Sequence, residues 1–284
     1  MASFRTDDGR TLAYREQGSG PHLVCHPGGP GFSALYLQDL AALGEHFSLI
    51  MLDPRGTGGS DRPTDADAYT IDDYVADVEA LRAHLGVPRM DLLGHSHGGV
   101  VAMAYASAHP ERIDRLVLAS TLARFAPEQA QAMTAAMEAR SGEPWYADAR
   151  AALEEEQGGG PGDDAALGAL VLRELPFYFA HYDAAAAAYA AVLAGESVNG
   201  DALGLFNREV MPAFDLRPGL PRITAPALVI TGDADFITGP MCADEIAAGI
   251  AGARKVIVPD TGHFIFIETP GPFRAEVLRF LARR

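Results

Sequence analysis

Residues 91–101, DLLGHSHGGVV, place a serine, two histidines and three glycines between two apolar runs. The five residues 94–98 match G-x-S-x-G, in which glycines allow a sharp strand-to-helix turn that exposes the serine hydroxyl. A metal-binding histidine pair would require further ligands at H-x-x-E-H or C-x-x-C spacing, and a phosphate loop would require G-x-x-x-x-G-K-[ST] or G-x-G-x-x-G. The sequence contains none of these patterns. A structural glycine turn is the other alternative, but the pattern favours a nucleophilic serine, Ser96.

A nucleophilic serine needs a general base, and the base needs a third group that orients it. In one recurrent arrangement these groups follow the chain order serine, acid, histidine. His263 follows the apolar run 255–260, and loops after the strands of a parallel sheet are where catalytic side chains gather. We expect His263 to be the base. Asp235 is the predicted acid, with Asp233 as the alternative.

Two backbone amides are expected to stabilise the negative oxygen that forms when a serine attacks a carbonyl group. One is the amide of His97, directly after the serine. The other is expected in CHPGGPGF, residues 25–32, where glycines let the backbone approach a substrate closely. We expect Gly29 to supply it. An ordinary turn explains these glycines less well, because the loop follows a run that reads as a buried strand.

Short apolar runs are expected to form the strands that position these groups. They lie at 22–26, 47–53, 89–96, 113–120, 226–231 and 255–260. Each is apolar almost throughout, as strands buried on both faces of a parallel sheet are. Amphipathic segments at 70–88, 241–250 and 272–281 predict helices between and after them. The alternation predicts a parallel sheet with helical crossovers.

A stretch without a convincing strand interrupts this alternation. Residues 121–218 are rich in Ala, Met and Glu, with helical segments at 130–140, 163–179 and 183–195. The simplest organisation is one α/β core in two parts, residues 1–120 and 219–284, with a helical cap at 121–218.

Composition narrows the classes of partner. The chain has 284 residues, 48% of them apolar, and a net charge of −16, which argues against nucleic acid or an anionic membrane as partner. Two distant cysteines, no secretion signal and no apolar run of about 20 residues predict a cytoplasmic protein. The chemistry above requires no metal or cofactor, and the expected partner is a small-molecule or short-peptide substrate.

The motifs and their order resemble the α/β-hydrolase superfamily. PGGPG (27–31) and DPRGTGGSD (53–61) are similar to its proline iminopeptidase-like branch. The resemblance implies an α/β fold with a mostly parallel central sheet, flanking helices and an inserted helical cap. It also implies a serine hydrolase that forms an acyl-enzyme on a small ester, lactone or amide. A proline iminopeptidase, a carbon–carbon bond hydrolase and a non-catalytic ligand-binding protein are the alternatives.

One departure from that branch bears on the substrate. Its aminopeptidases carry a glutamate directly after the triad aspartate, where it helps to hold the free amine of the substrate, but here that residue is Phe236. A cap glutamate also contributes in those enzymes; Glu209 is the candidate, although an exposed helix face is the favoured interpretation. We therefore expect uncharged acyl groups to be preferred. The aromatic residues Phe177, Tyr178 and Phe179 are expected to line the substrate pocket from the cap.

Overall fold

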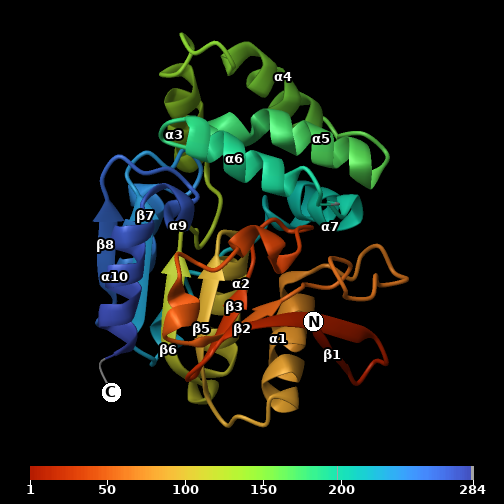
Figure 1. Cartoon of the computed structure of the whole chain (residues 1–284), viewed down its shortest axis with the longest axis vertical. Helices are drawn as coiled ribbons and strands as arrows, with labels where there is room; N and C mark the ends of the chain where they lie inside the picture. The colour runs from red at the N-terminus through yellow and green to blue at the C-terminus, as the bar shows by residue number, and fades with distance from the viewer. Residues whose placement is uncertain (197, 283–284) are drawn as a thin grey trace.

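The protein is built around one eight-stranded sheet (Figure 1). The structure is a computed structural model that describes residues 1–196 and 198–282. The strands are β1 (Ala2–Arg5), β2 (Thr11–Gly18), β3 (His22–His26), β4 (Ser48–Leu52), β5 (Met90–His95), β6 (Ile113–Ala119), β7 (Ala227–Gly232) and β8 (Arg254–Val258). They lie side by side in the order β1-β2-β4-β3-β5-β6-β7-β8. The pairs β1–β2 and β2–β4 are antiparallel, and all the others are parallel.

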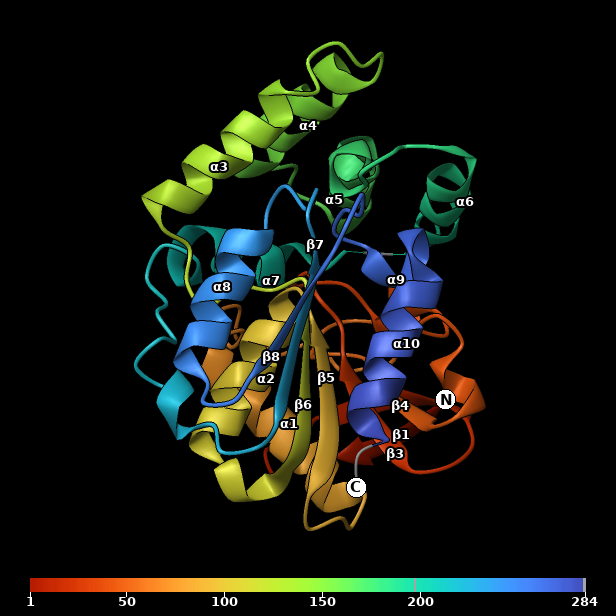
Figure 2. The ribbon, with the colours of Figure 1, turned by 90° about the vertical axis from the view of Figure 1, so that its left-hand side faces the viewer.

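Helices cover both faces of the sheet (Figure 2). Those of the core are α1 (Ile71–His84), α2 (His97–Ala108), α8 (Pro240–Gly249), α9 (Ile265–Glu268) and α10 (Pro270–Leu281). Successive residues of a strand point to opposite faces, so Val24 of β3 packs in the core under α1, α2 and α8, while Cys25 packs in the core under α10. Each face thus buries an apolar layer, which is why the central strands are apolar runs without alternation.

All six predicted strands and the three predicted core helices are present. The helix expected at 70–88 is α1; Thr70 and Asp73 form a capping box at its start, and Gly86 follows its end with a φ of +67°. The hairpin of β1 and β2 was not predicted. β1 buries only one of its residues, and β2 buries three in succession before it becomes polar and exposed, so neither is a continuous apolar run and the criterion that found the central strands misses them.

A helical region is inserted between β6 and β7 and covers the carboxyl ends of the parallel strands (Figure 1, Figure 2). It contains α3 (Pro127–Glu138), α4 (Tyr146–Gln157), α5 (Asp164–Glu174), α6 (Ala184–Leu193) and α7 (Gly200–Leu205), with short helical turns at Leu175–Tyr178 and Phe206–Val210. Among the described residues, no helix combines the length and apolar character needed to cross a membrane.

Candidate active site

Ser96 occupies the tight turn between β5 and α2. Its backbone angles, a φ of 55° and a ψ of −123°, lie in a region that residues other than glycine rarely adopt. The neighbouring glycines are required by close packing, since a Cβ at Gly94 would lie 2.2 Å from the Gly98 carbonyl oxygen, and one at Gly98 would lie 2.2 Å from that of His26. The turn presents the Ser96 side chain to a cavity beneath the cap.

His263 and Asp235 lie on the loops that follow β8 and β7, and they are in contact. His263 Nδ1 is 3.0 Å from Asp235 Oδ2, and both side chains are almost fully buried. Burial opposes ionisation of Asp235, but the adjacent imidazole and the hydrogen bonds from the Thr238 amide and hydroxyl outweigh it and hold the pKa of this carboxyl well below its usual range. An ionised Asp235 accepts a hydrogen bond from His263 Nδ1–H, which leaves Nε2 as the acceptor nitrogen. Asp233 is exposed and contacts the Thr261 amide instead.

The loop that carries His263 is fixed to the cap. The His263 amide donates to the Tyr178 carbonyl oxygen at 2.7 Å. Glu268 accepts hydrogen bonds from the amides of Gly262 and Ala180, one on each side of this junction, at 2.8 and 2.7 Å. These bonds hold the imidazole and the 178–180 segment of the cap in one position relative to each other.

A chain of buried hydrogen bonds joins this loop to the glycine-rich loop 27–32. The Gly28 amide donates to the Tyr36 hydroxyl, which lies 2.8 Å from His95 Nδ1, and His95 Nε2 lies 3.0 Å from the His263 carbonyl oxygen. Because a carbonyl only accepts, Nε2 carries the proton and Nδ1 accepts from Tyr36. Burial and the nearby His263 lower the pKa of His95 to about 3, so the ring is neutral as this pattern requires. No sequence motif pointed to Tyr36.

The two backbone amides that are expected to stabilise an oxyanion lie at the edge of the cavity. His97 is the first residue of α2, and Gly29, with a φ of +107°, lines the cavity. The Gly28 amide is occupied by Tyr36, whereas those of Gly29 and His97 donate to no group within residues 1–196 and 198–282. The His97 ring is buried against Tyr74 and Phe206, and burial lowers its pKa to about 3. Only its backbone is therefore available for chemistry.

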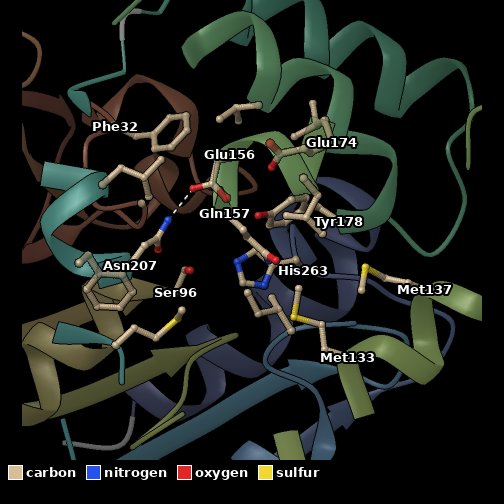
Figure 3. Close-up of a pocket in the computed structure, with 18 of the residues that line it drawn as sticks. Phe32, Ser96, Met133, Met137, Glu156, Gln157, Glu174, Tyr178, Asn207 and His263 are labelled. Atoms are coloured by element: carbon tan, nitrogen blue, oxygen red, sulfur yellow. Dashed lines mark hydrogen bonds between the residues drawn. The ribbon is translucent and has the colours of Figure 1, made fainter. Parts of the chain in front are cut away.

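The cavity has a volume of about 490 Å³ and lies between the sheet and the cap (Figure 3). Ser96 and His263 line its floor, and no hydrogen bond joins them in this structure; such bonds often form only when substrate binds. Among the described residues, no group of three or more His, Cys, Asp or Glu side chains is arranged to hold a metal ion.

The predicted substrate-binding residues are mostly elsewhere. Tyr178 lines the cavity, whereas Phe177, Phe179 and Phe236 do not. Phe236 is 4% exposed and stacks on Phe177 at a centroid distance of 5.8 Å, so these rings form part of the cap core. Glu209 is exposed and also lies outside the lining. Sequence patterns mark an aromatic residue as buried, but they do not distinguish a ring in the core from one that faces a cavity.

The cavity lining also includes three carboxyl groups that were not foreseen, and two of them, Glu156 and Glu174, lack a cationic partner among the residues that the structure describes. Glu156 is the next-to-last residue of α4 and accepts a hydrogen bond from Asn207 at 2.5 Å, while Glu174 ends α5 and is 2% exposed (Figure 3). Glu174 Oε1 is buried without a hydrogen-bond partner. Burial, reinforced by the neighbouring charge of Glu156, raises the pKa of Glu174 to about 8. Nothing in the sequence separates these glutamates from those on exposed helix faces.

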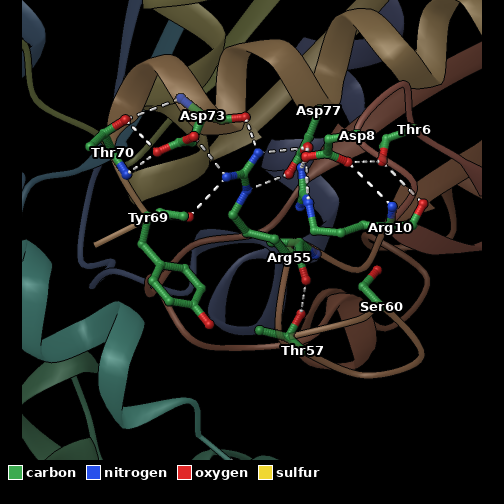
Figure 4. A network of polar contacts seen from close by, with 12 residues as sticks. Thr6, Asp8, Arg10, Arg55, Thr57, Ser60, Tyr69, Thr70, Asp73 and Asp77 are labelled. Atoms are coloured by element: carbon green, nitrogen blue, oxygen red, sulfur yellow. Dashed lines mark hydrogen bonds and ion pairs between the residues drawn. The ribbon is translucent and has the colours of Figure 1, made fainter. Parts of the chain in front are cut away.

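The DPRGTGGSD segment has a structural role (Figure 4). Arg55 makes two hydrogen bonds to Asp77 of α1, at 2.7 and 2.8 Å, and pairs with Asp73 at 2.9 Å. Asp53 accepts from the amides of Ala34 and Gly59, at 3.0 Å each. The segment thereby ties α1 to the chain that follows the glycine-rich loop.

Comparison with known proteins agrees with this architecture. The sequence profile of the family described as alpha/beta hydrolase fold matches residues 21–270. Polyketide synthase ThaQ of Burkholderia thailandensis is 31% identical over 273 residues; the match covers 93% of this chain but only 12% of ThaQ. Proline iminopeptidase PfmaB of Pestalotiopsis fici is 29% identical, with 94% of this chain and 95% of that protein covered.

A solved structure extends the similarity over the whole chain. The enol-lactonase of Burkholderia xenovorans LB400 superimposes with a TM-score of 0.74 at 29% identity, and the match covers 99% of this chain and 100% of the other. The mostly parallel sheet, its flanking helices and the inserted helical region are those expected from the motifs, and the β1–β2 hairpin extends the sheet to eight strands. The chain is a member of the alpha/beta hydrolase fold family.

Proposed function

We propose that this protein is a serine hydrolase that cleaves a small ester, lactone or amide through an acyl-enzyme. The observation that carries the proposal is the 3.0 Å contact between His263 and an ionised Asp235 at a cavity that Ser96 also lines. An enol-lactonase and a proline iminopeptidase among the similar proteins support a hydrolase of carbonyl compounds.

In the proposed mechanism, Ser96 Oγ attacks the carbonyl carbon of the substrate while its proton passes to His263 Nε2. Asp235 stabilises the resulting imidazolium, and the amides of Gly29 and His97 donate to the negative oxygen. Collapse of this intermediate expels the alcohol or amine, which takes the proton from His263. Water then attacks the acyl-enzyme with the same base and releases the acid.

Proline iminopeptidase activity is less well supported than esterase or lactonase activity. Phe236 occupies the position of the amine-binding glutamate of that branch and is buried among aromatic rings. The cap candidate Glu209 is exposed. Neither residue can hold the ammonium group of an N-terminal proline beside the triad, since a buried ammonium needs a carboxylate partner.

Covalent labelling with a fluorophosphonate tests the proposal. Wild-type protein should be labelled at Ser96, and Ser96→Ala should abolish labelling and lower kcat on p-nitrophenyl butanoate by at least about 10⁴-fold. Ser120→Ala is the matched control, because Ser120 follows the adjacent strand β6, is buried and also has a positive φ. Equal labelling of wild type and Ser96→Ala, or loss of labelling only in Ser120→Ala, would contradict the assignment.

A further inference from the structure

The cap side of the cavity carries two carboxyl groups without a cationic partner. Glu174 is 2% exposed, and its Oε1 atom has no hydrogen-bond partner. Glu156 is held by Asn207 through one oxygen, and both carboxyl groups face the cavity (Figure 3). We propose that Glu156 and Glu174 form a subsite for a protonated amine on the substrate. This inference rests on the proposed hydrolase function and adds the substrate class.

The charges around the cavity leave this pair uncompensated. The lining contains the carboxyl groups of Glu154, Glu156 and Glu174, and among the described residues Arg150 is its one arginine or lysine. Arg150 is already paired with Glu154 at 2.7 Å and with Glu138 at 3.1 Å. Within the described residues, no salt bridge reaches Glu156 or Glu174. Without a ligand nothing in the described residues favours ionisation of Glu174, and an ammonium group bound beside it would supply the missing positive charge.

Burial makes the pair costly unless a ligand completes it. Burial raises the pKa of Glu156, and it raises the pKa of Glu174 to about 8. Buried polar atoms are nearly always hydrogen-bonded, so an unpartnered carboxyl oxygen facing a cavity points to a donor that arrives with the substrate. An alkylammonium group supplies both the charge and the N–H donor, and its hydrogen bonds to a carboxylate are stronger than neutral ones.

The geometry separates this subsite from the reacting carbonyl group. The Tyr178 ring lies next to His263, with the ring centroids 5.4 Å apart, and Glu174 lies on the far side of the Tyr178 ring from His263 (Figure 3). The amine is thus expected on a side chain or tail of the substrate, away from the scissile bond. This conclusion replaces the expectation of an uncharged acyl group, which was based on Phe236, a residue outside the cavity lining.

A matched pair of esters tests the subsite. p-Nitrophenyl 6-(dimethylamino)hexanoate carries a protonated amine at neutral pH, and p-nitrophenyl 7-methyloctanoate is its uncharged isostere. In wild type, kcat/KM should be at least about tenfold higher for the amine. Glu174→Gln should remove most of this preference by lowering kcat/KM for the amine, with less than about a threefold change for the isostere.

Glu154→Gln is the control, since Glu154 lines the same cavity but is already paired with Arg150. It should leave the preference unchanged. A second pair, 2-(dimethylamino)ethyl butanoate and 3-methylbutyl butanoate, places the amine on the alcohol side and identifies which half of the substrate carries it. The subsite is refuted if wild type has the higher kcat/KM for the isostere in both pairs. It is also refuted if Glu174→Gln lowers kcat/KM equally for the amine and its isostere in each pair.

Direct binding keeps this test independent of turnover. Isothermal titration with N,N-dimethylhexylamine should give binding to wild type that Glu174→Gln weakens at least about tenfold, while thermal unfolding shows that the variant is folded. Equal binding by both proteins refutes the subsite even if the enzyme hydrolyses esters. Amine binding that depends on Glu174, without fluorophosphonate labelling of Ser96, would instead refute the hydrolase function and leave the subsite standing.

Discussion

Replacing Glu174 by glutamine is expected to make the stability of the protein less dependent on pH. The unfolded chain exposes Glu174 to water, where its pKa is near the ordinary 4.5, whereas burial raises the pKa in the folded protein to about 8. Between these values the unfolded state ionises and the folded state does not. The stability contributed by the protonated carboxyl is therefore complete below pH 4.5 and is lost as the pH rises toward 8.

The size of the effect follows from the width of this interval. Each pH unit between the two pKa values lowers the free energy of unfolding by about 1.4 kcal/mol. From pH 5.5 to 7.5, Glu174 alone thus costs wild type about 2 to 3 kcal/mol, and glutamine, which does not titrate, removes this loss. For a chain of this length the difference corresponds to roughly 5 °C in Tm.

Urea unfolding at pH 5.5, 6.5 and 7.5 measures the difference directly. The stability of Glu174→Gln relative to wild type should increase with pH by the amount above. Glu154→Gln should follow wild type at each pH, because the side chain of Glu154 is 62% exposed and paired with Arg150. A gap between Glu174→Gln and wild type that stays constant or narrows toward pH 7.5 would refute the reasoning about burial.

Four further substitutions test the site and its support. Asp235→Asn should lower kcat by about 10⁴-fold in steady-state assays, whereas Asp233→Asn should change it by less than about threefold, because only Asp235 contacts the imidazole; the reverse ranking would reassign the acid. Phe236→Glu should lower the free energy of unfolding by about 3 kcal/mol or more in urea titrations without creating an amine site, since the new carboxylate would be buried without a partner. Arg55→Met should cost about 3 to 5 kcal/mol in the same assay, because it leaves Asp77 buried with only one of its two arginine partners; an unchanged midpoint would show that the pair adds nothing.

The core of the fold was predictable because its signals are local in sequence. Buried parallel strands are continuous apolar runs, and the glycines around Ser96 are dictated by contacts of 2.2 Å that no other residue can satisfy. The acid was predictable as one of two aspartates, since both follow the same strand. Only the fold shows that Asp235 turns inward to His263 while Asp233 faces solvent.

The cap was predictable as helices but not as a binding surface. Which side of a cap helix faces the cavity depends on how the inserted helices pack on the core, and a single sequence does not encode this in any short pattern. Phe177 and Tyr178 are adjacent in sequence, yet one lies in the core and the other lines the cavity. Glu156 and Glu174 could not be predicted as lining residues for the same reason, because their burial comes from packing between α4, α5 and the segment around Asn207.

The attachment of the cap has a consequence for how the protein can change. The cap leaves the sheet after β6 and returns at β7, and these strands are direct neighbours, with Ala119 opposite Ile230. The sheet is therefore continuous whatever the length of the excursion between them. Insertions, deletions or exchange of the cap can alter which molecules enter without disturbing the register of the strands that carry Ser96, Asp235 and His263. The strand register is thus independent of the cap, whereas the position of His263 still depends on the cap segment 178–180 that its amide contacts.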